Sequence, residues 1–189
     1  MQTDGQSAPR LPPGLFAAIS LIATVGLSLS LTIPLLSLEM ARMGVSGRDI
    51  GINTAVAGLA SVLVVPYIPA LAARVGVGRT IAAALLASVC SIIAFRLFFD
   101  YRAWVLIRFV YSIGLSALFL LSEFWIASVA PPERRGFIMG LYATVLALGF
   151  AVGPTLLAAV GTSGWPPYLT GTALLALAAL PPFLARHRV

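Results

Sequence analysis

The chain has 189 residues, of which 60% are hydrophobic and only 10% are charged. Soluble domains carry about 25% charged residues, so this composition excludes an ordinary cytosolic enzyme and a disordered protein and favours the lipid bilayer as solvent. The net charge of +6 comes from arginines that are mostly spread singly between apolar runs. Because nucleic-acid binding needs a clustered basic surface, we expect an integral membrane protein without a nucleic-acid partner.

Taken in chain order, the apolar runs divide into six expected membrane-spanning helices, at about 20 residues per span. They cover residues 15–38, 50–71, 80–99, 103–129, 136–160 and 167–185. The turns between them hold charged residues, glycine or proline, and Pro66 and Pro69 mark the end of the second helix. The sequence therefore predicts an all-α, polytopic bundle over residues 13–185, with short tails at 1–12 and 186–189.

The arginines that flank these helices indicate how the bundle is oriented. Seven fall on the side of the two termini and four on the other side, with one more inside the fourth helix. The larger group is Arg10, Arg74, Arg79, Arg134, Arg135, Arg186 and Arg188, and the smaller group is Arg42, Arg48, Arg96 and Arg102. Because cytoplasmic loops carry an excess of Lys and Arg, we expect both tails in the cytoplasm and the protein in a bacterial inner membrane.

The sequence offers little for hydrolytic or metal chemistry. Cys90 is the only cysteine and lies in an apolar run, and His187, the only histidine, is the third residue from the C-terminus. These two residues supply neither a Cys–His dyad nor a Cys/His metal cluster. We therefore expect no enzyme, no metal and no cofactor.

Two ionisable residues, Arg108 and Glu123, lie inside the fourth expected helix. An intramembrane charge costs roughly 3 kcal/mol at a helix centre and is a functional candidate by default. Arg108 either contacts an anionic substrate group or a proton-carrying acid, or is a snorkelling, structural arginine. The two residues are about 22 Å apart along the helix and about 60° apart around it, so they cannot form one ion pair within it.

Glu123 either carries protons or gates the inner side of a transport path, or it forms a structural ion pair, which is the interpretation that we favour. Its candidate partners are Arg74, Arg134 and Arg135. Glu39 and Asn53 lie at outer helix ends, where helix capping and solvation explain polar side chains. Asn53 is kept as a further candidate for substrate or ion coupling.

The fifth expected helix carries signals of close helix packing. Small residues let membrane helices approach, and Gly136 with Gly140 and Gly149 with Gly153 form two such pairs. Gly140 and Gly149 lie about 180° apart around the axis at 100° per residue, so both faces are open to contact and we expect this helix inside the bundle. Pro154, which removes a backbone hydrogen bond, is expected to kink it.

Four local motifs follow one another along these helices. They are the turn with Arg74, Gly76 and Arg79; Arg108 followed by Ser112, Gly114 and Ala117; Pro132–Gly136 with Arg135; and Gly149–Pro154. In this order, on six spans, they resemble the amino-terminal half of a major facilitator superfamily transporter over nearly the whole chain. Arg74 and Gly76 match the family pattern G-x-x-x-D-R-x-G-R, but Pro69 stands in the place of the first glycine and Ala73 in the place of the aspartate.

The resemblance implies a secondary transporter that moves a small molecule by alternating access, with substrate bound between two six-helix halves. The chain would act as a homodimer, or it would be the amino-terminal half of a longer transporter. The missing aspartate, which in the family helps to lock and release the cytoplasmic side, favours an alternative. In that alternative, the chain is a membrane accessory or assembly subunit that docks a larger complex without transporting.

Overall fold

The structure is a computed structural model that describes residues 13–185. The predicted tails and their residues Arg10, Arg186, His187 and Arg188 lie outside this range. The elements within it are α1 (Pro13–Arg42), α2 (Gly47–Val64), η1 (Val65–Tyr67), α3 (Ile68–Val75), α4 (Val77–Leu97), α5 (Tyr101–Val129), η2 (Pro132–Arg134), α6 (Arg135–Val160) and α7 (Pro166–Ala185). The described part of the chain contains helices and no strand, which confirms the all-α class.

Five helical segments are long and apolar enough to cross a membrane. They are Ala18–Arg42, Gly47–Val75, Val77–Leu97, Tyr101–Val129 and Pro132–Val160. The remaining long helix, α7, has 20 residues, but its side chains are described only as far as Ala178, so the sixth crossing stays a prediction. The protein is a polytopic, all-α membrane protein.

The second membrane segment is not the single helix expected over residues 50–71. It is divided into α2, η1 and α3 because Pro66 and Pro69 have no backbone N–H to donate to the preceding turn. After α3, the chain reverses through one residue: Gly76 has a φ of +96°, a conformation that glycine adopts without steric cost, and α4 begins at Val77.

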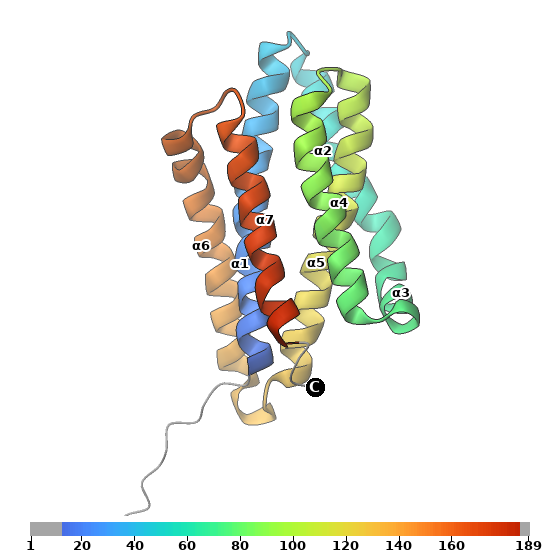
Figure 1. The fold of residues 1–189 in the computed structure, drawn as a ribbon, viewed down its shortest axis with the longest axis vertical. Helices are drawn as coiled ribbons and strands as arrows, with labels where there is room; N and C mark the ends of the chain where they lie inside the picture. The colour runs from blue at the N-terminus through green and yellow to red at the C-terminus, as the bar shows by residue number, and fades with distance from the viewer. Residues whose placement is uncertain (1–12, 186–189) are drawn as a thin grey trace, which may run out of the picture.

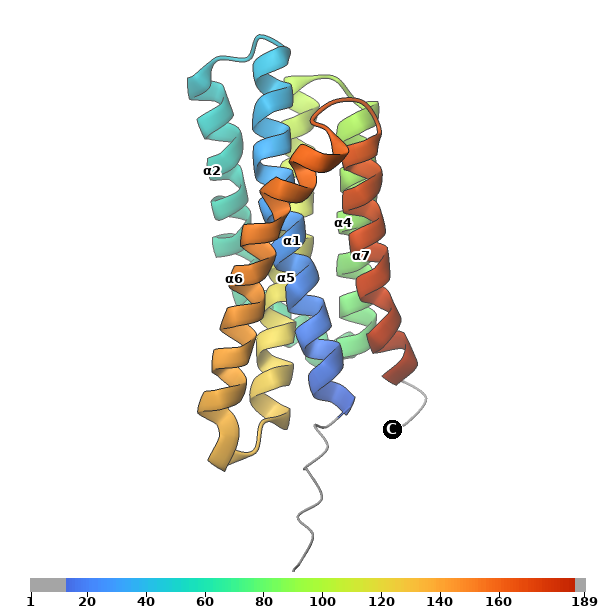
Figure 2. The ribbon, with the colours of Figure 1, turned by 90° about the vertical axis from the view of Figure 1, so that its left-hand side faces the viewer.

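The helices run up and down, and α1 and α5 occupy the centre of the bundle (Figure 1). In the view of Figure 2, α2 and most of α6 lie to the left of α1 and α5, whereas α4 and α7 lie to the right. In their most apolar windows, 61% of the residues of the α1 segment but only 17% of those of the α2–α3 and η2–α6 segments are buried. The two flanking segments therefore leave most of their surface without a protein neighbour.

The position of α6 corrects the expectation that it lies inside the bundle. One face, with Gly149 and Gly153, packs against α1, and a Cβ on Gly149 would lie 3.1 Å from the Ala23 carbonyl oxygen. Gly136 and Gly140 have nothing within 4 Å of a built Cβ. Gly149 and Gly153 therefore serve helix packing, whereas Gly136 and Gly140 do not. Pro154 lies in the upper third of α6, where Figure 2 shows the helix leaning over.

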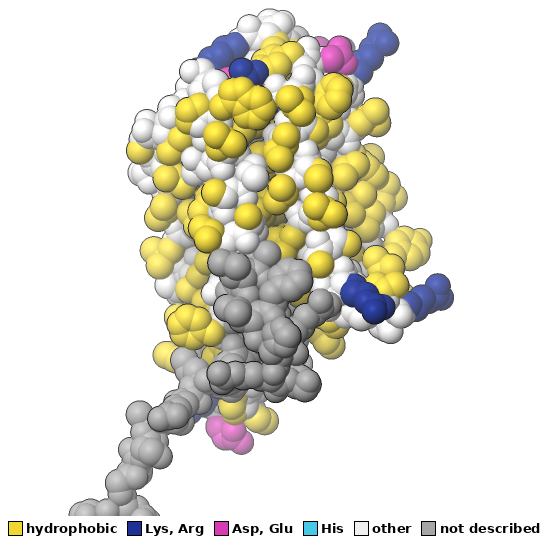
Figure 3. Space-filling model, in the orientation of Figure 1, with side chains coloured by type: hydrophobic (Ala, Val, Ile, Leu, Met, Phe, Trp, Pro, Cys, Tyr) yellow, Lys and Arg dark blue, Asp and Glu magenta, His cyan; other side chains and the backbone are white. Residues whose placement is uncertain are grey.

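The surface has the distribution expected for a protein in lipid. Hydrophobic side chains cover the visible side of the bundle outside the grey region, and arginines appear at its ends (Figure 3). The first described residues of α1 and the last of α7 lie at the same end, the lower one in Figure 1. At the upper end, the Ser46 side chain accepts a hydrogen bond from the Asp49 N–H, and the Asp100 carboxylate accepts one from the Ala103 N–H, so that both caps fix helix starts.

Candidate functional site

A cavity of about 490 Å³ lies between α1, α2, η1 and α5. Its lining residues are Val25, Leu29, Ala57, Gly58, Ser61, Val65, Ser112, Leu115, Ser116, Phe119, Leu120 and Glu123. Cavities of about 300–1,000 Å³ accommodate drug-sized ligands. The cavity is therefore large enough for a small organic molecule.

The helical repeat of α5 places one stripe of its side chains along this cavity. Ser112, Ser116, Phe119 and Glu123 are separated by four, three and four residues, the spacing that keeps side chains on one helix face. Opposite them, α2 contributes the small residues Ala57, Gly58 and Ser61. Small side chains on both helices, among them Ala57 and Gly58 of α2 and Ser112 and Ser116 of α5, leave room for the cavity.

Two serine hydroxyls connect α2 to α5 across the lining. The Ser61 and Ser116 oxygens are 2.7 Å apart, and the Ser61 hydroxyl donates to the Ala57 carbonyl at 3.0 Å. Ser116 is then the donor to Ser61, because a hydroxyl has one proton. The hydroxyls of Ser61 and Ser116 are thus hydrogen-bonded within the protein.

Glu123 lies at the lower end of the lining and has no ion-pair partner in the part of the chain that the structure describes, where Glu39 and Arg42 form the one ion pair at 2.8 Å. The structure therefore does not bring Glu123 together with any of its three predicted arginine partners. Tyr142 of α6 packs against the α5 stripe; it is buried, is not among the lining residues, and its hydroxyl has no hydrogen-bond partner among the described residues. The Tyr142 and Phe119 rings meet edge to face, with centroids 6.5 Å apart.

Arg108 lies one helical turn above Ser112 on α5 and is not among the lining residues. Its side chain is 4% exposed, and its Nε atom has no hydrogen-bond partner among the described residues. Its neighbour Tyr111 shares a hydrogen bond with Thr32 of α1 at 3.0 Å. Arg108 is therefore held inside the bundle and does not snorkel to the membrane surface.

The two polar residues expected at solvated helix ends are buried instead. Asn53 is 1% exposed, and neither polar atom of its amide has a hydrogen-bond partner within residues 13–185. Glu39 is 6% exposed and accepts the hydrogen bond of Arg42, which also binds Thr162 in the loop before α7. α1 continues past Glu39 to Arg42, so the glutamate lies within the last turns of the helix and not beyond them.

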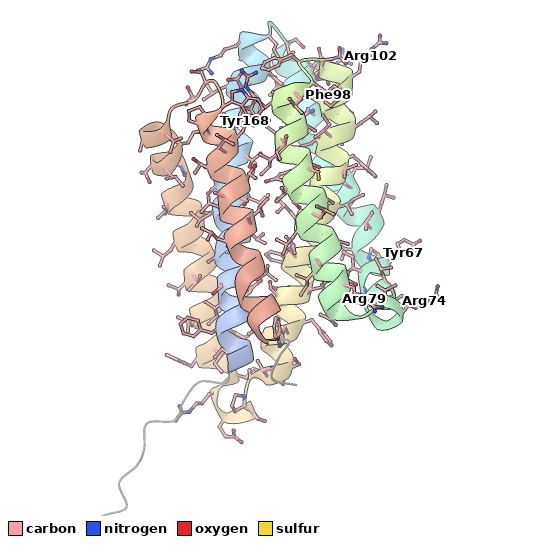
Figure 4. All side chains as sticks on the ribbon, in the orientation of Figure 1. Tyr67, Arg74, Arg79, Phe98, Arg102 and Tyr168 are labelled. Atoms are coloured by element: carbon pink, nitrogen blue, oxygen red, sulfur yellow. The ribbon has the colours of Figure 1, made fainter. Side chains whose placement is uncertain are left out.

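The residues of the loop motifs lie at the lower end of the bundle, away from the cavity. Figure 4 shows Arg74 and Arg79 there, on either side of the Gly76 turn between α3 and α4. Arg135 begins α6 and donates from Nη2 to the Ala127 carbonyl at 3.2 Å. None of these three arginines lines the cavity, so any role in gating would act at this end of the bundle.

Sequence reasoning missed the uncharged polar groups of the site, above all Ser61, Ser116 and Tyr142. Ser116 lies eight residues after Arg108 and seven before Glu123, close to one helical face with both, and this periodicity would have identified it. Ser61 and Tyr142 lie on other helices, and no local pattern relates them to α5.

Two comparisons with known proteins agree with this architecture. The model of the family described as Major Facilitator Superfamily matches residues 18–188. The chain is also similar to the "Uncharacterized MFS-type transporter YfkF" of Bacillus subtilis (strain 168), with 23% identity over 154 residues. That alignment covers 82% of this chain and 39% of the relative.

Proposed function

The chain belongs to the Major Facilitator Superfamily, and from this premise we propose that it is one six-helix half of a secondary transporter that moves a small molecule by alternating access. The observation that carries the proposal is the cavity between α1, α2 and α5. In this architecture, two six-helix halves are related by an axis along the membrane normal, with substrate near the midplane between them. The cavity would be this half's share of the substrate site.

The low burial of the flanking helices supports the proposal that a second six-helix half packs against this one. Only 17% of the residues in the apolar windows of the α2–α3 and η2–α6 segments are buried, and α2 and most of α6 lie on the same side of the bundle, opposite α4 and α7 (Figure 2). A second copy of the chain in the same orientation would satisfy a two-fold axis normal to the membrane. The following half of a longer polypeptide would occupy the same place.

The proposed orientation places the lower end of the bundle in the cytoplasm. Arg74, Arg79, Arg134 and Arg135 belong to turns at this end, and the tails add Arg10, Arg186 and Arg188. The opposite end has four arginines, so the excess of positive charge favours cytoplasmic tails in a bacterial inner membrane.

Alternating access can be tested without knowing the substrate. In a Cys90→Ser background, Ser112→Cys places the one thiol in the cavity lining, and a membrane-impermeant maleimide is added from either side of native membranes. We expect labelling from both sides, because the cavity opens to each in turn. Leu86→Cys on α4, at a side chain that is 65% exposed on the outer surface, is the control that should stay unlabelled because the charged, impermeant reagent does not enter the lipid.

Labelling of Ser112→Cys from one side only, or from neither, would contradict the proposal. The second candidate function, a membrane subunit that docks a larger complex, is favoured by Ala73 at the place of the family's aspartate. It predicts co-purification with stoichiometric foreign subunits, and no flux of any tested compound into liposomes.

A further inference from the structure

The charge and shape of the cavity narrow the class of substrate, given the transport function proposed above. Glu123 is the one charged residue among the lining residues, and no arginine of the described chain neutralises it through an ion pair. A charge surrounded by apolar side chains acts on a ligand far more strongly than the same charge in water. The cavity is therefore selective for the sign of a ligand's charge.

An organic anion does not fit this arrangement. It would meet the Glu123 carboxylate, and its nearest intramembrane cation, Arg108, is 4% exposed and outside the lining. Arg108 and Glu123 are also about 22 Å apart along α5. An anionic group in the cavity would thus be repelled at one end without a partner at the other.

A sugar or other polyol does not fit either. Each buried hydroxyl needs a hydrogen-bond partner, and leaving one unpaired costs about 1–3 kcal/mol. The hydroxyls of the lining belong to Ser61, Ser112 and Ser116, and Ser61 is already bonded to Ser116 and to the Ala57 carbonyl. The remaining lining is mainly aliphatic.

The lower end of the cavity has the groups that bind an organic cation. Phe119 precedes Glu123 by one helical turn on α5, and both residues line the cavity. A cation within about 6 Å of an aromatic ring centre is attracted by its face, and the carboxylate supplies the counter-charge. Above them, Val25, Leu29 and Leu115 belong to an apolar lining that reaches toward Ser112.

We propose that the substrate is a lipophilic organic cation, whose charged group binds at Glu123 and Phe119 while its apolar body occupies the cavity between α1, α2 and α5. Such a ligand has few polar atoms, so it needs few hydrogen bonds from the serines of the lining. The cavity volume of about 490 Å³ admits a drug-sized cation.

The test measures binding of tetraphenylphosphonium to the full chain in detergent by equilibrium dialysis, with protein-free micelles as background. Tetraphenylborate, which has the same shape and the opposite charge, is the competitor. We expect saturable tetraphenylphosphonium binding that tetraphenylborate does not compete for, and at least a tenfold higher Kd in Glu123→Gln. Glu133→Gln, which neutralises the exposed acid of η2 at the same end, should stay within twofold of the wild type.

Glu123→Asp keeps the charge and should bind more tightly than Glu123→Gln, which separates charge recognition from a folding defect. Equal binding by Glu123→Gln and the wild type, equal binding of the two tetraphenyl ions, or no binding at all would overturn the proposal. These results leave the transport function standing if Ser112→Cys is labelled from both sides of the membrane. If Ser112→Cys is not labelled from both sides, the proposed transport function is wrong, regardless of the result for cation binding.

Discussion

At the scale of single residues, Arg108 is a buried charge that forms no ion pair with an acidic residue between positions 13 and 185. It is 4% exposed, and no carboxylate of the described chain lies within ion-pair distance. Replacing a buried charge by an apolar side chain of similar length is often neutral or stabilising. A charged residue inside a membrane-spanning helix is a functional candidate by default.

We therefore predict that Arg108→Met keeps or raises the stability of the detergent-solubilised protein, by up to about 3 kcal/mol, the cost of a central intramembrane arginine on insertion scales. Flux of the transported compound in proteoliposomes should fall below a tenth of the wild-type value. Thermal unfolding and flux are measured on the same preparation. A clear loss of stability would show that Arg108 holds the bundle together and does not serve transport.

Residue positions along one helix could be predicted from the sequence, but their neighbours on other helices could not. The spacing of Arg108 and Glu123 on α5 follows from the helical repeat. The burial of Asn53 and Glu39 depends on how the helices pack around them. The predicted ion pair of Glu123 with Arg74, Arg134 or Arg135 is absent from the described residues for the same reason. Opposite charges near one membrane surface do not determine which helices pack against each other.

At the scale of helices, the packing of α6 on α1 depends on glycines that let the backbones approach. A Cβ on Gly153 would lie 2.6 Å from the Ser30 Cβ and 2.8 Å from the Ser30 carbonyl carbon. The Ser30 hydroxyl also donates to the Gly149 carbonyl at 2.9 Å. The contact is thus formed by backbone as well as side chain and cannot relax by a rotamer change alone.

Gly153→Ala should accordingly destabilise the protein by about 1–3 kcal/mol, the usual cost of overpacking a tight contact. Gly140→Ala is the matched control, because it lies on the same helix with nothing within 4 Å of its Cβ. Both changes alter helix propensity equally, so the difference between their unfolding free energies isolates the packing. Equal stabilities would mean that α6 does not approach α1 as closely as the structure has it.

Sequence motifs predicted which helices are apolar and where they turn, and the family resemblance is confirmed by the match over residues 18–188. These motifs did not predict which face of a helix packs against another helix. Small-residue pairs mark both faces of α6, and Gly149 with Gly153 contacts α1 while Gly136 with Gly140 does not. An exposed glycine pair and a packed one have the same local sequence, because the difference lies in the partner helix.

At the scale of the whole molecule, the proposed two-fold axis makes a geometric prediction about which helices meet. α2 and most of α6 lie on one side of the bundle, and α4 and α7 lie on the other (Figure 2). If the α2–α6 side faces the axis, a rotation by 180° about the membrane normal brings α2 of one copy opposite α6 of the other. The same rotation leaves α4 on the outside. Contacts between copies should therefore join unlike helices, as in an isologous dimer.

Two co-expressed, differently tagged copies in the Cys90→Ser background test this arrangement. One carries Val62→Cys on α2 and the other Leu148→Cys on α6, at side chains that are 73% and 58% exposed. A short bis-maleimide in native membranes should link these two copies at least fivefold more than it links either to a copy with Leu86→Cys on α4. If the α4 pairs react equally, the contacts are random collisions in the membrane. If no pair reacts, the second half is not another copy of this chain, and the cavity must be closed by a different six-helix unit.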